Sequence, residues 1–258
     1  MNLTVVPLLC LEDNYSYLLA GPGKSRALVV DPADGEAVRA ALRERGWELD
    51  AVLVTHHHFD HVAGIESLVA QRKVPVYGPE TECGRIPDAS RGLRDGEEIE
   101  GDGFLVTAVH VPGHTLGHLV YRCADVLFTG DTLFLGGCGR LFEGSAAQMF
   151  DSLCRKILAF PEETKVYPGH EYTVRTRSFS LSVDPANTRL QELLRESKAL
   201  RSQGLPTVPG LLGTEKATNV FLRCADAAVV RSVQARFPDT AGDPLSVFTR
   251  LRSMMDAF

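Results

Sequence analysis

Residues 51–61 read AVLVTHHHFDH and pass from an apolar run directly into four His and one Asp. Residues 51–55 predict a buried strand, and the apolar residues at 62, 63, 65 and 68 predict a helix after it. Side chains at the end of such a strand are held by rigid elements, and imidazole with carboxylate suits zinc, iron or manganese. An exposed His tract is the alternative interpretation, but few such tracts follow a buried strand and contain an Asp. The segment therefore predicts part of a metal site.

Three later strands are followed by the same kinds of side chain. Strand 104–110 leads to VPGHTLGH, strand 126–129 to GDT, and strand 165–167 to PGHE. A glycine beside each His or Asp lets the backbone approach closely. Each segment alone is typical of a turn, but together they predict that the rest of the metal site comes from these loops.

The composition is that of a soluble globular protein. The chain has 258 residues, of which 44% are hydrophobic and 23% charged. It has no run of about 20 apolar residues, as a membrane helix needs. Its N-terminus shows no basic leader and reaches Glu12 and Asp13 early, which favours a strand over a secretory signal. Six Cys without a C-x-x-C pair indicate reduced thiols, so we expect a cytoplasmic protein.

The net charge of −6 is unevenly distributed along the chain. Residues 1–173 contain 15 Lys and Arg against 25 Asp and Glu, whereas residues 174–258 contain 12 against 8. The body therefore carries −10 and the tail +4, and all eight His fall between residues 56 and 170. An acidic body argues against a nucleic-acid partner.

Alternating apolar runs and amphipathic stretches predict an α/β domain over residues 1–173. Its strands are expected at residues 4–9, 15–19, 27–30, 51–55, 74–77, 104–110, 119–122, 126–129 and 165–167. Residues 36–45 predict a helix that ends at Gly46. Ser145 and Gln148 predict a capping box at the start of another.

The remaining residues, 174–258, predict a smaller helical domain. Two Asp-Pro pairs, Asp184-Pro185 and Asp243-Pro244, each offer an N-cap followed by proline at the first helical position. A third helix is expected over residues 225–236. Residues 204–221, with two Pro and three Gly, are expected to be a long connector.

These motifs resemble a known family. The H-x-H-x-D-H pattern at residues 56–61, followed in order by His114, Asp131 and His170, resembles the metallo-β-lactamase superfamily. The segments GDTLF (130–134), GCGRLFEG (137–144) and GHEYT (169–173), with the helical tail, narrow the resemblance to glyoxalase II, the hydroxyacylglutathione hydrolases. The resemblance implies an αββα sandwich followed by a small C-terminal helical domain.

The resemblance also implies a binuclear metal site. It assigns one divalent metal to His56, His58 and His114, and the other to Asp60, His61 and His170, with Asp131 bridging them. Seven ligands are too many for one tetrahedral zinc ion but suit two metals. We expect both metal ions to be zinc, and the same ligands would also suit iron or manganese. Three histidines are expected not to bind metal directly: His57 is expected beside the ligands or exposed, His110 to pack or hydrogen-bond within its strand, and His118 to have a structural role or to lie beside the ligands.

The implied reaction is thioester hydrolysis. A hydroxide bridging the two metals would attack the thioester carbonyl, with Asp131, Asp60 and His58 as catalytic residues, and a thiolate would leave without a strong general acid. The implied substrate is a small-molecule glutathione thioester such as S-lactoylglutathione, which yields glutathione and D-lactate in the second step of methylglyoxal detoxification. We expect no nucleic-acid or membrane partner, and a monomer.

The resemblance places the substrate on Arg140, Tyr172 and Arg252. Two positions depart from the family pattern. Met255 stands where the family has a lysine, so one charge contact is missing, and Phe142 stands where some members have tyrosine.

Other functions fit parts of the sequence. Another thioester hydrolase, a mononuclear iron persulfide dioxygenase or a non-catalytic metal-binding module would share most of these residues. A nucleic-acid hydrolase is disfavoured by the acidic body. Cys138, in a glycine-rich loop, is an alternative nucleophile, but every nearby His is already needed as a ligand.

Overall fold

The computed structural model describes residues 3–70 and 72–258. Met1, Asn2 and Gln71 lie outside the described residues, as does the part of the N-terminal leader prediction that involves the first two. The chain divides into two compact units. The first comprises Met1–His110 and Gly117–Gly130, and the second Val111–Leu116 and Asp131–Phe258.

The first unit contains a mixed six-stranded sheet. Its strands lie in chain order: β1 (Thr4–Cys10), β2 (Asn14–Ala20), β3 (Arg26–Val30), β4 (Glu48–Leu53), β5 (Val76–Pro79) and β6 (Arg91–Leu93). β1, β2 and β3 pair antiparallel, whereas β3 to β6 pair parallel. The carboxyl ends of the parallel strands therefore share one edge, where β4 delivers the His-rich segment.

A second layer in the same unit is antiparallel. It consists of β7 (Glu98–Gly101), β8 (Phe104–His110), β9 (Leu119–Cys123) and β10 (Val126–Gly130). The rings of Tyr17 and Phe128 lie 5.3 Å apart, and the Tyr121 hydroxyl donates to the Val54 carbonyl at 2.7 Å. These contacts join the two layers across a core of buried side chains.

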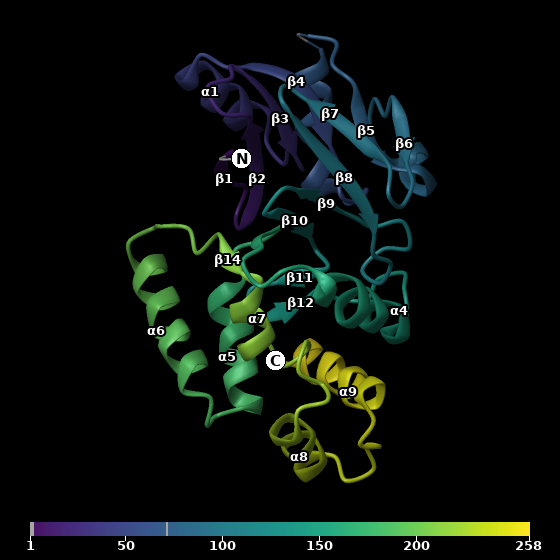
Figure 1. Ribbon diagram of the computed structural model, residues 1–258, viewed down its shortest axis with the longest axis vertical. Helices are drawn as coiled ribbons and strands as arrows, with labels where there is room; N and C mark the ends of the chain where they lie inside the picture. The colour runs from purple at the N-terminus through teal and green to yellow at the C-terminus, as the bar shows by residue number, and fades with distance from the viewer. Residues whose placement is uncertain (1–2, 71) are drawn as a thin grey trace. The chain divides into compact units, whose positions relative to one another are not determined.

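Helices cover the first sheet (Figure 1). In α1 (Gly35–Arg45) and α3 (Ile65–Val69), Val38, Leu42, Ile65 and Leu68 pack in one cluster with strand residues such as Val52. Gly46 ends α1 at φ 64°, as the sequence predicts. The helix expected after the His-rich segment is two short helices, α2 (Phe59–Val62) and α3, and η1 (Glu80–Arg85) follows β5.

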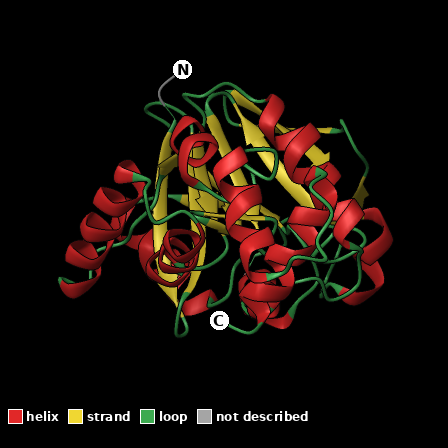
Figure 2. Ribbon diagram, turned by 90° about the horizontal axis from the view of Figure 1, so that it is seen from below, coloured by secondary structure: helices red, strands yellow, loops and turns green. Residues whose placement is uncertain are grey.

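The second unit is mainly helical. Figure 2 draws the helices of the described residues in red. Its helices are α4 (Ala146–Asp151), which continues through a π turn, η2 (Ser152–Lys156), and a 3-10 turn, η3 (Ile157–Ala159), then α5 (Thr173–Val183), α6 (Thr188–Ser202), α7 (Leu212–Thr218), α8 (Ala227–Arg236) and α9 (Pro244–Asp256). Two short pairs of strands accompany them: β11 (Leu133–Phe134) with β12 (Gly137–Cys138), and β13 (Lys165–Pro168) with β14 (Gly210–Leu211). The Ser145–Gln148 capping box and the Asp243 cap before Pro244 are confirmed.

Two predictions for the tail are wrong. Asp184 ends α5 instead of starting a helix, because its carboxylate is occupied by Arg223 and by Asn187, and it is Asn187 that caps α6. The connector expected over residues 204–221 contains β14 and α7.

No helix within residues 3–70 and 72–258 combines the length and the apolar character that crossing a bilayer requires. The six cysteines are free, four of them buried.

Candidate functional site

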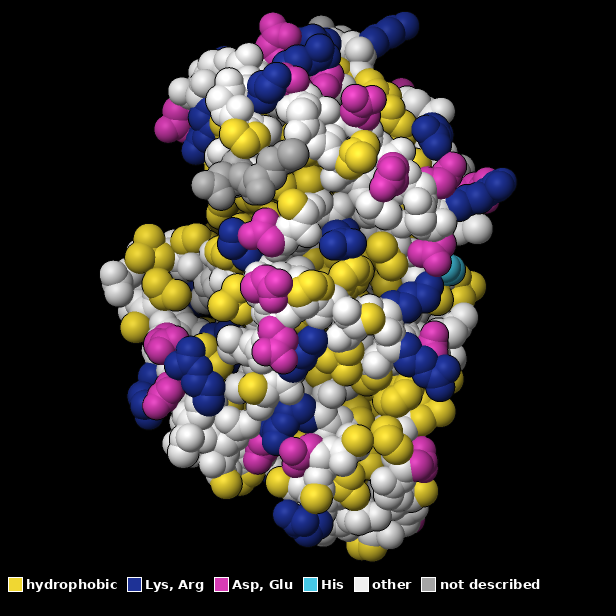
Figure 3. Space-filling model, viewed as in Figure 1, with side chains coloured by type: hydrophobic (Ala, Val, Ile, Leu, Met, Phe, Trp, Pro, Cys, Tyr) yellow, Lys and Arg dark blue, Asp and Glu magenta, His cyan; other side chains and the backbone are white. Residues whose placement is uncertain are grey.

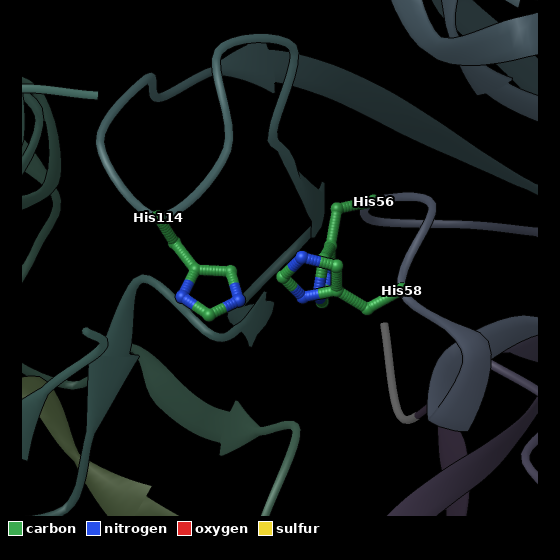
Figure 4. A group of neighbouring side chains, drawn as sticks. All are labelled: His56, His58 and His114. Atoms are coloured by element: carbon green, nitrogen blue, oxygen red, sulfur yellow. The ribbon is translucent and has the colours of Figure 1, made fainter. Parts of the chain in front are cut away.

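Four of the candidate ligands follow β4. Figure 4 shows His56 and His58 leaving the segment after this strand with their rings close together. Asp60 and His61 come one turn later, on α2. His56 and His61 are buried, whereas His58 and Asp60 are partly exposed. Six consecutive residues of the first unit therefore supply three candidate imidazole ligands and one candidate carboxylate ligand.

Asp31 orients two of these imidazoles. The Thr55 hydroxyl donates its only proton to Asp31 Oδ2 at 2.7 Å, so it accepts from His56 Nδ1 at 3.0 Å. His61 Nδ1 lies 3.0 Å from the same carboxylate oxygen. A proton on Nδ1 leaves Nε2 of each ring with a lone pair, which is the form that binds a metal ion.

Asn14 holds Asp60 in a similar way. Its side-chain amide donates to Asp60 Oδ2 at 2.9 Å and to the Asp60 carbonyl at 3.1 Å. The same carboxylate oxygen lies 3.8 Å from His61 Nε2. Donor atoms of Asp60 and His61 therefore lie close together.

The second unit brings together the other three candidates. His170 Nε2 lies 3.3 Å and His114 Nε2 3.6 Å from Asp131 Oδ2, and all three side chains are buried. His114, also drawn in Figure 4, has its Nδ1 2.8 Å from the Arg140 carbonyl, which can only accept. With the proton on Nδ1, the lone pair of His114 lies on Nε2, the nitrogen 3.6 Å from Asp131 Oδ2.

The remaining histidines have other partners. His57 donates its backbone N–H to Glu82 Oε2 at 2.9 Å, and its Nδ1 lies 2.7 Å from the same oxygen. His118 is buried and stacks on His56, with ring centroids 4.8 Å apart. His110 ends β8 and is partly exposed.

The donor chemistry of these side chains fits divalent metal ions. Five imidazoles and two carboxylates have donor atoms placed in groups that could hold a metal: His56, His58, Asp60, His61, His114, Asp131 and His170. Neutral imidazole with carboxylate suits zinc, iron and manganese alike, so the donors specify the class of ion and not the element.

Beside Asp131, the second unit forms a pocket of about 230 Å³. Its wall combines aromatic, aliphatic and cationic side chains: His114, Asp131, Phe134, Cys138, Arg140, Phe142, Tyr172, Arg175, Thr176, Arg252 and Met255. A mixed apolar and cationic wall is suited to a flexible organic anion.

The three predicted substrate residues all line this pocket. Tyr172 stacks on His170, with ring centroids 4.6 Å apart and planes within 2°. Arg140 is exposed and pairs with Asp256 at 3.2 Å. Arg252 is 6% exposed and donates to the Cys138 carbonyl at 2.7 Å and to Asp256 at 3.1 Å.

Cys138 lies in the same wall but is poorly suited to act as a nucleophile. Its side chain is buried, and burial raises the pKa of the thiol to about 11, although the neighbouring Arg252 guanidinium partly offsets this. At neutral pH the group is therefore a thiol and not the reactive thiolate.

α7 fixes the β11–β12 hairpin behind the pocket. Asn219, at the end of α7, donates to the Gly137 carbonyl at 3.0 Å, and the buried Glu215 accepts from the Gly136 N–H at 2.6 Å. Burial raises the pKa of the Glu215 carboxyl, with Arg177 opposing this effect. These contacts hold the hairpin whose two ends carry Asp131 and Arg140.

Two family profiles together match residues 11–258 of the chain. The profile described as "Metallo-beta-lactamase superfamily" matches residues 11–170, and "Hydroxyacylglutathione hydrolase C-terminus" matches residues 171–258. A hydroxyacylglutathione hydrolase from Alkalilimnicola ehrlichii is 45% identical over 254 residues, which is 98% of each chain. The chain belongs to the hydroxyacylglutathione hydrolase family of the metallo-beta-lactamase superfamily. The predicted family and the α/β fold with a helical C-terminal part are thus confirmed.

Solved structures agree with the fold. A crystal structure of ETHE1 from Myxococcus xanthus matches at a TM-score of 0.68 over 98% of this chain and 99% of that chain, with 23% identity. TTHA1623, solved in a di-iron-bound form, matches 65% of this chain and 91% of its own length at 32% identity, with a TM-score of 0.53. These likenesses concern the fold alone, over 98% of the chain for the first structure and 65% for the second.

Proposed function

We propose that this chain hydrolyses S-2-hydroxyacylglutathione thioesters, such as S-lactoylglutathione, to glutathione and a 2-hydroxy acid, here D-lactate. The observation that carries the proposal is the 45% identity to a hydroxyacylglutathione hydrolase over 98% of both chains. The pocket supports it, because an anionic substrate with an apolar stretch matches a wall of arginine, phenylalanine and tyrosine. The reaction would serve methylglyoxal detoxification as its second step.

The proposed metal site uses all seven candidate ligands. His56, His58 and His114 would hold one ion, Asp60, His61 and His170 the other, and Asp131 both. The Nδ1 partners of His56, His61 and His114 support this assignment, since a proton on Nδ1 places the lone pair of each ring on Nε2. Two bound divalent cations would lower the pKa of a shared water and polarise the thioester carbonyl. Zinc is the ion we propose, although iron and manganese suit the same donors.

Side chains of the protein orient the proposed metal ligands and the substrate. Asn14 fixes Asp60, and Asp31 fixes His61 directly and His56 through Thr55. Arg140, Tyr172 and Arg252 would orient the thiol part of the substrate beside Asp131. A thiol of pKa about 8.5 leaves readily, so no general acid is required.

The setting proposed for this activity is the cytoplasm, where free thiols persist. The enzyme would act as a monomer on a small molecule, with neither nucleic acid nor membrane as partner. Residues 1–173 would form the catalytic domain and residues 174–258 the helical substrate-binding domain.

Two substitutions test the proposal. Asp131→Asn and His58→Ala should each lower hydrolysis of S-lactoylglutathione by about 100-fold or more while the chain remains folded, because each removes a ligand. Asp239→Asn and His110→Ala serve as matched controls outside the proposed ligand set and should retain activity. Full activity of either ligand variant would rule out the proposed chemistry. Cleavage of other thioesters alone, or sulfite production with a single iron per chain, would instead assign another function of the superfamily.

A further inference from the structure

The pocket beside Asp131 contains three arginines that differ in what they already bind. Arg140 pairs with Asp256 Oδ1 through Nε at 3.2 Å. Arg252 pairs with the same oxygen at 3.1 Å and donates to the carbonyls of Cys138 and Gly139 at 2.7 and 3.3 Å. One carboxylate therefore neutralises part of the charge of both guanidinium groups.

Arg175 is the third arginine, and it differs from the other two in its surroundings. It lies in the first turn of α5, three residues after Tyr172, and its side chain is exposed while lining the pocket. Among residues 3–70 and 72–258, no side chain forms an ion pair or hydrogen bond with its guanidinium. Met255 lies in the same wall, and its thioether offers no charge.

This arrangement matters for an anionic ligand. A glutathione thioester carries two carboxylates and one ammonium group at neutral pH. A guanidinium without an internal partner can bind a carboxylate without first breaking an ion pair. The positive end of α5 adds to the attraction at the same point.

We propose that Arg175 binds a carboxylate of the glutathione part of the substrate and so determines the preference for an anionic thioester. The inference rests on the proposed function, and it names the residue that supplies the charge which Met255 cannot. Because Arg175 would bind a part of the substrate that does not react, it should contribute equally to the ground state and the transition state.

Binding of S-methylglutathione, which cannot be hydrolysed, tests this inference without turnover. Titration calorimetry should show Arg175→Ala weakening the affinity by about 10- to 100-fold, and Arg175→Lys weakening it less, since a hydrogen bond to a charged group is lost. Arg195→Ala is the matched control, because Arg195 is an exposed helical arginine that does not line the pocket. Its affinity should be that of the wild type. Equal affinities of Arg175→Ala and the wild type would overturn the inference.

Kinetics separate this inference from the proposed function. Arg175→Ala should raise KM for S-lactoylglutathione while kcat stays close to that of the wild type, and it should leave hydrolysis of the neutral S-lactoyl-N-acetylcysteamine unchanged. A parallel loss of rate on both thioesters would contradict a role in binding the anion. If the wild type hydrolysed neither compound, the proposed function would fail, and the binding experiment would still decide the role of Arg175.

Discussion

Cys138 lies close to the proposed site, but its burial makes the thiol unreactive. The thiol lies in the pocket wall, but burial raises its pKa to about 11, so it stays protonated at neutral pH. We predict that Cys138→Ala retains kcat/KM for S-lactoylglutathione within about threefold. We also predict that alkylation of Cys138 by iodoacetamide remains slow at pH 7 and accelerates only as pH approaches 11. A 100-fold decrease of kcat/KM in Cys138→Ala would contradict this prediction and indicate that the cysteine is the nucleophile.

Two carboxylates that hold histidines of the site, Asp31 and Glu82, differ in whether the sequence could have predicted their role. Asp31 follows the buried strand β3 directly, in the same pattern as the candidate ligands, so its link to Thr55 and His61 could have been predicted from that pattern. Glu82 could not, because it lies in a short 3-10 helix with no repeated spacing and meets His57 and Gly117 only through the fold.

At the scale of elements, the hairpin of β11 and β12 depends on close backbone approach. A Cβ on Gly139 would lie 1.7 Å from the Asp131 carbonyl oxygen, so alanine cannot be accommodated without a shift of backbone. We predict that Gly139→Ala costs roughly 1–3 kcal/mol of unfolding free energy and displaces Asp131. Thermal unfolding and metal content of the purified variant would measure both effects.

Gly84→Ala is the matched control for that variant, because a Cβ at Gly84 would have nothing within 4 Å. Its melting temperature and metal content should match those of the wild type. A Gly139→Ala protein that behaved in the same way would show that this close approach does not position Asp131.

Element prediction succeeded where periodicity or capping was strong. The long strands, α1, the capping box of α4 and the cap of α9 follow from local patterns, and β8 spans the predicted residues 104–110. The strands of two to four residues, such as β11 and β14, are too short to show alternation. α5 was missed because Thr176, Arg177 and Ser180 stand on its buried side, where their polar groups bond to neighbouring carbonyls and to Ser197.

At the scale of the whole molecule, net charge and local charge carry different information. The chain is acidic overall at −6, and on the face drawn in Figure 3 basic and acidic side chains of the described residues alternate. The pocket wall nevertheless contains Arg140, Arg175 and Arg252, with Asp256 offsetting two of them. An anionic substrate is therefore attracted by local geometry and not by the field of the whole protein.

The central claim is that this chain is a metal-dependent thioester hydrolase that uses two ions. The most direct measurement starts from chelated protein, adds zinc in steps, and follows bound metal and release of glutathione from S-lactoylglutathione in the same samples. We predict negligible hydrolysis without metal and activity that rises until two ions are bound per chain. Hydrolysis that is unaffected by chelation, or no hydrolysis with two ions bound, would contradict the account.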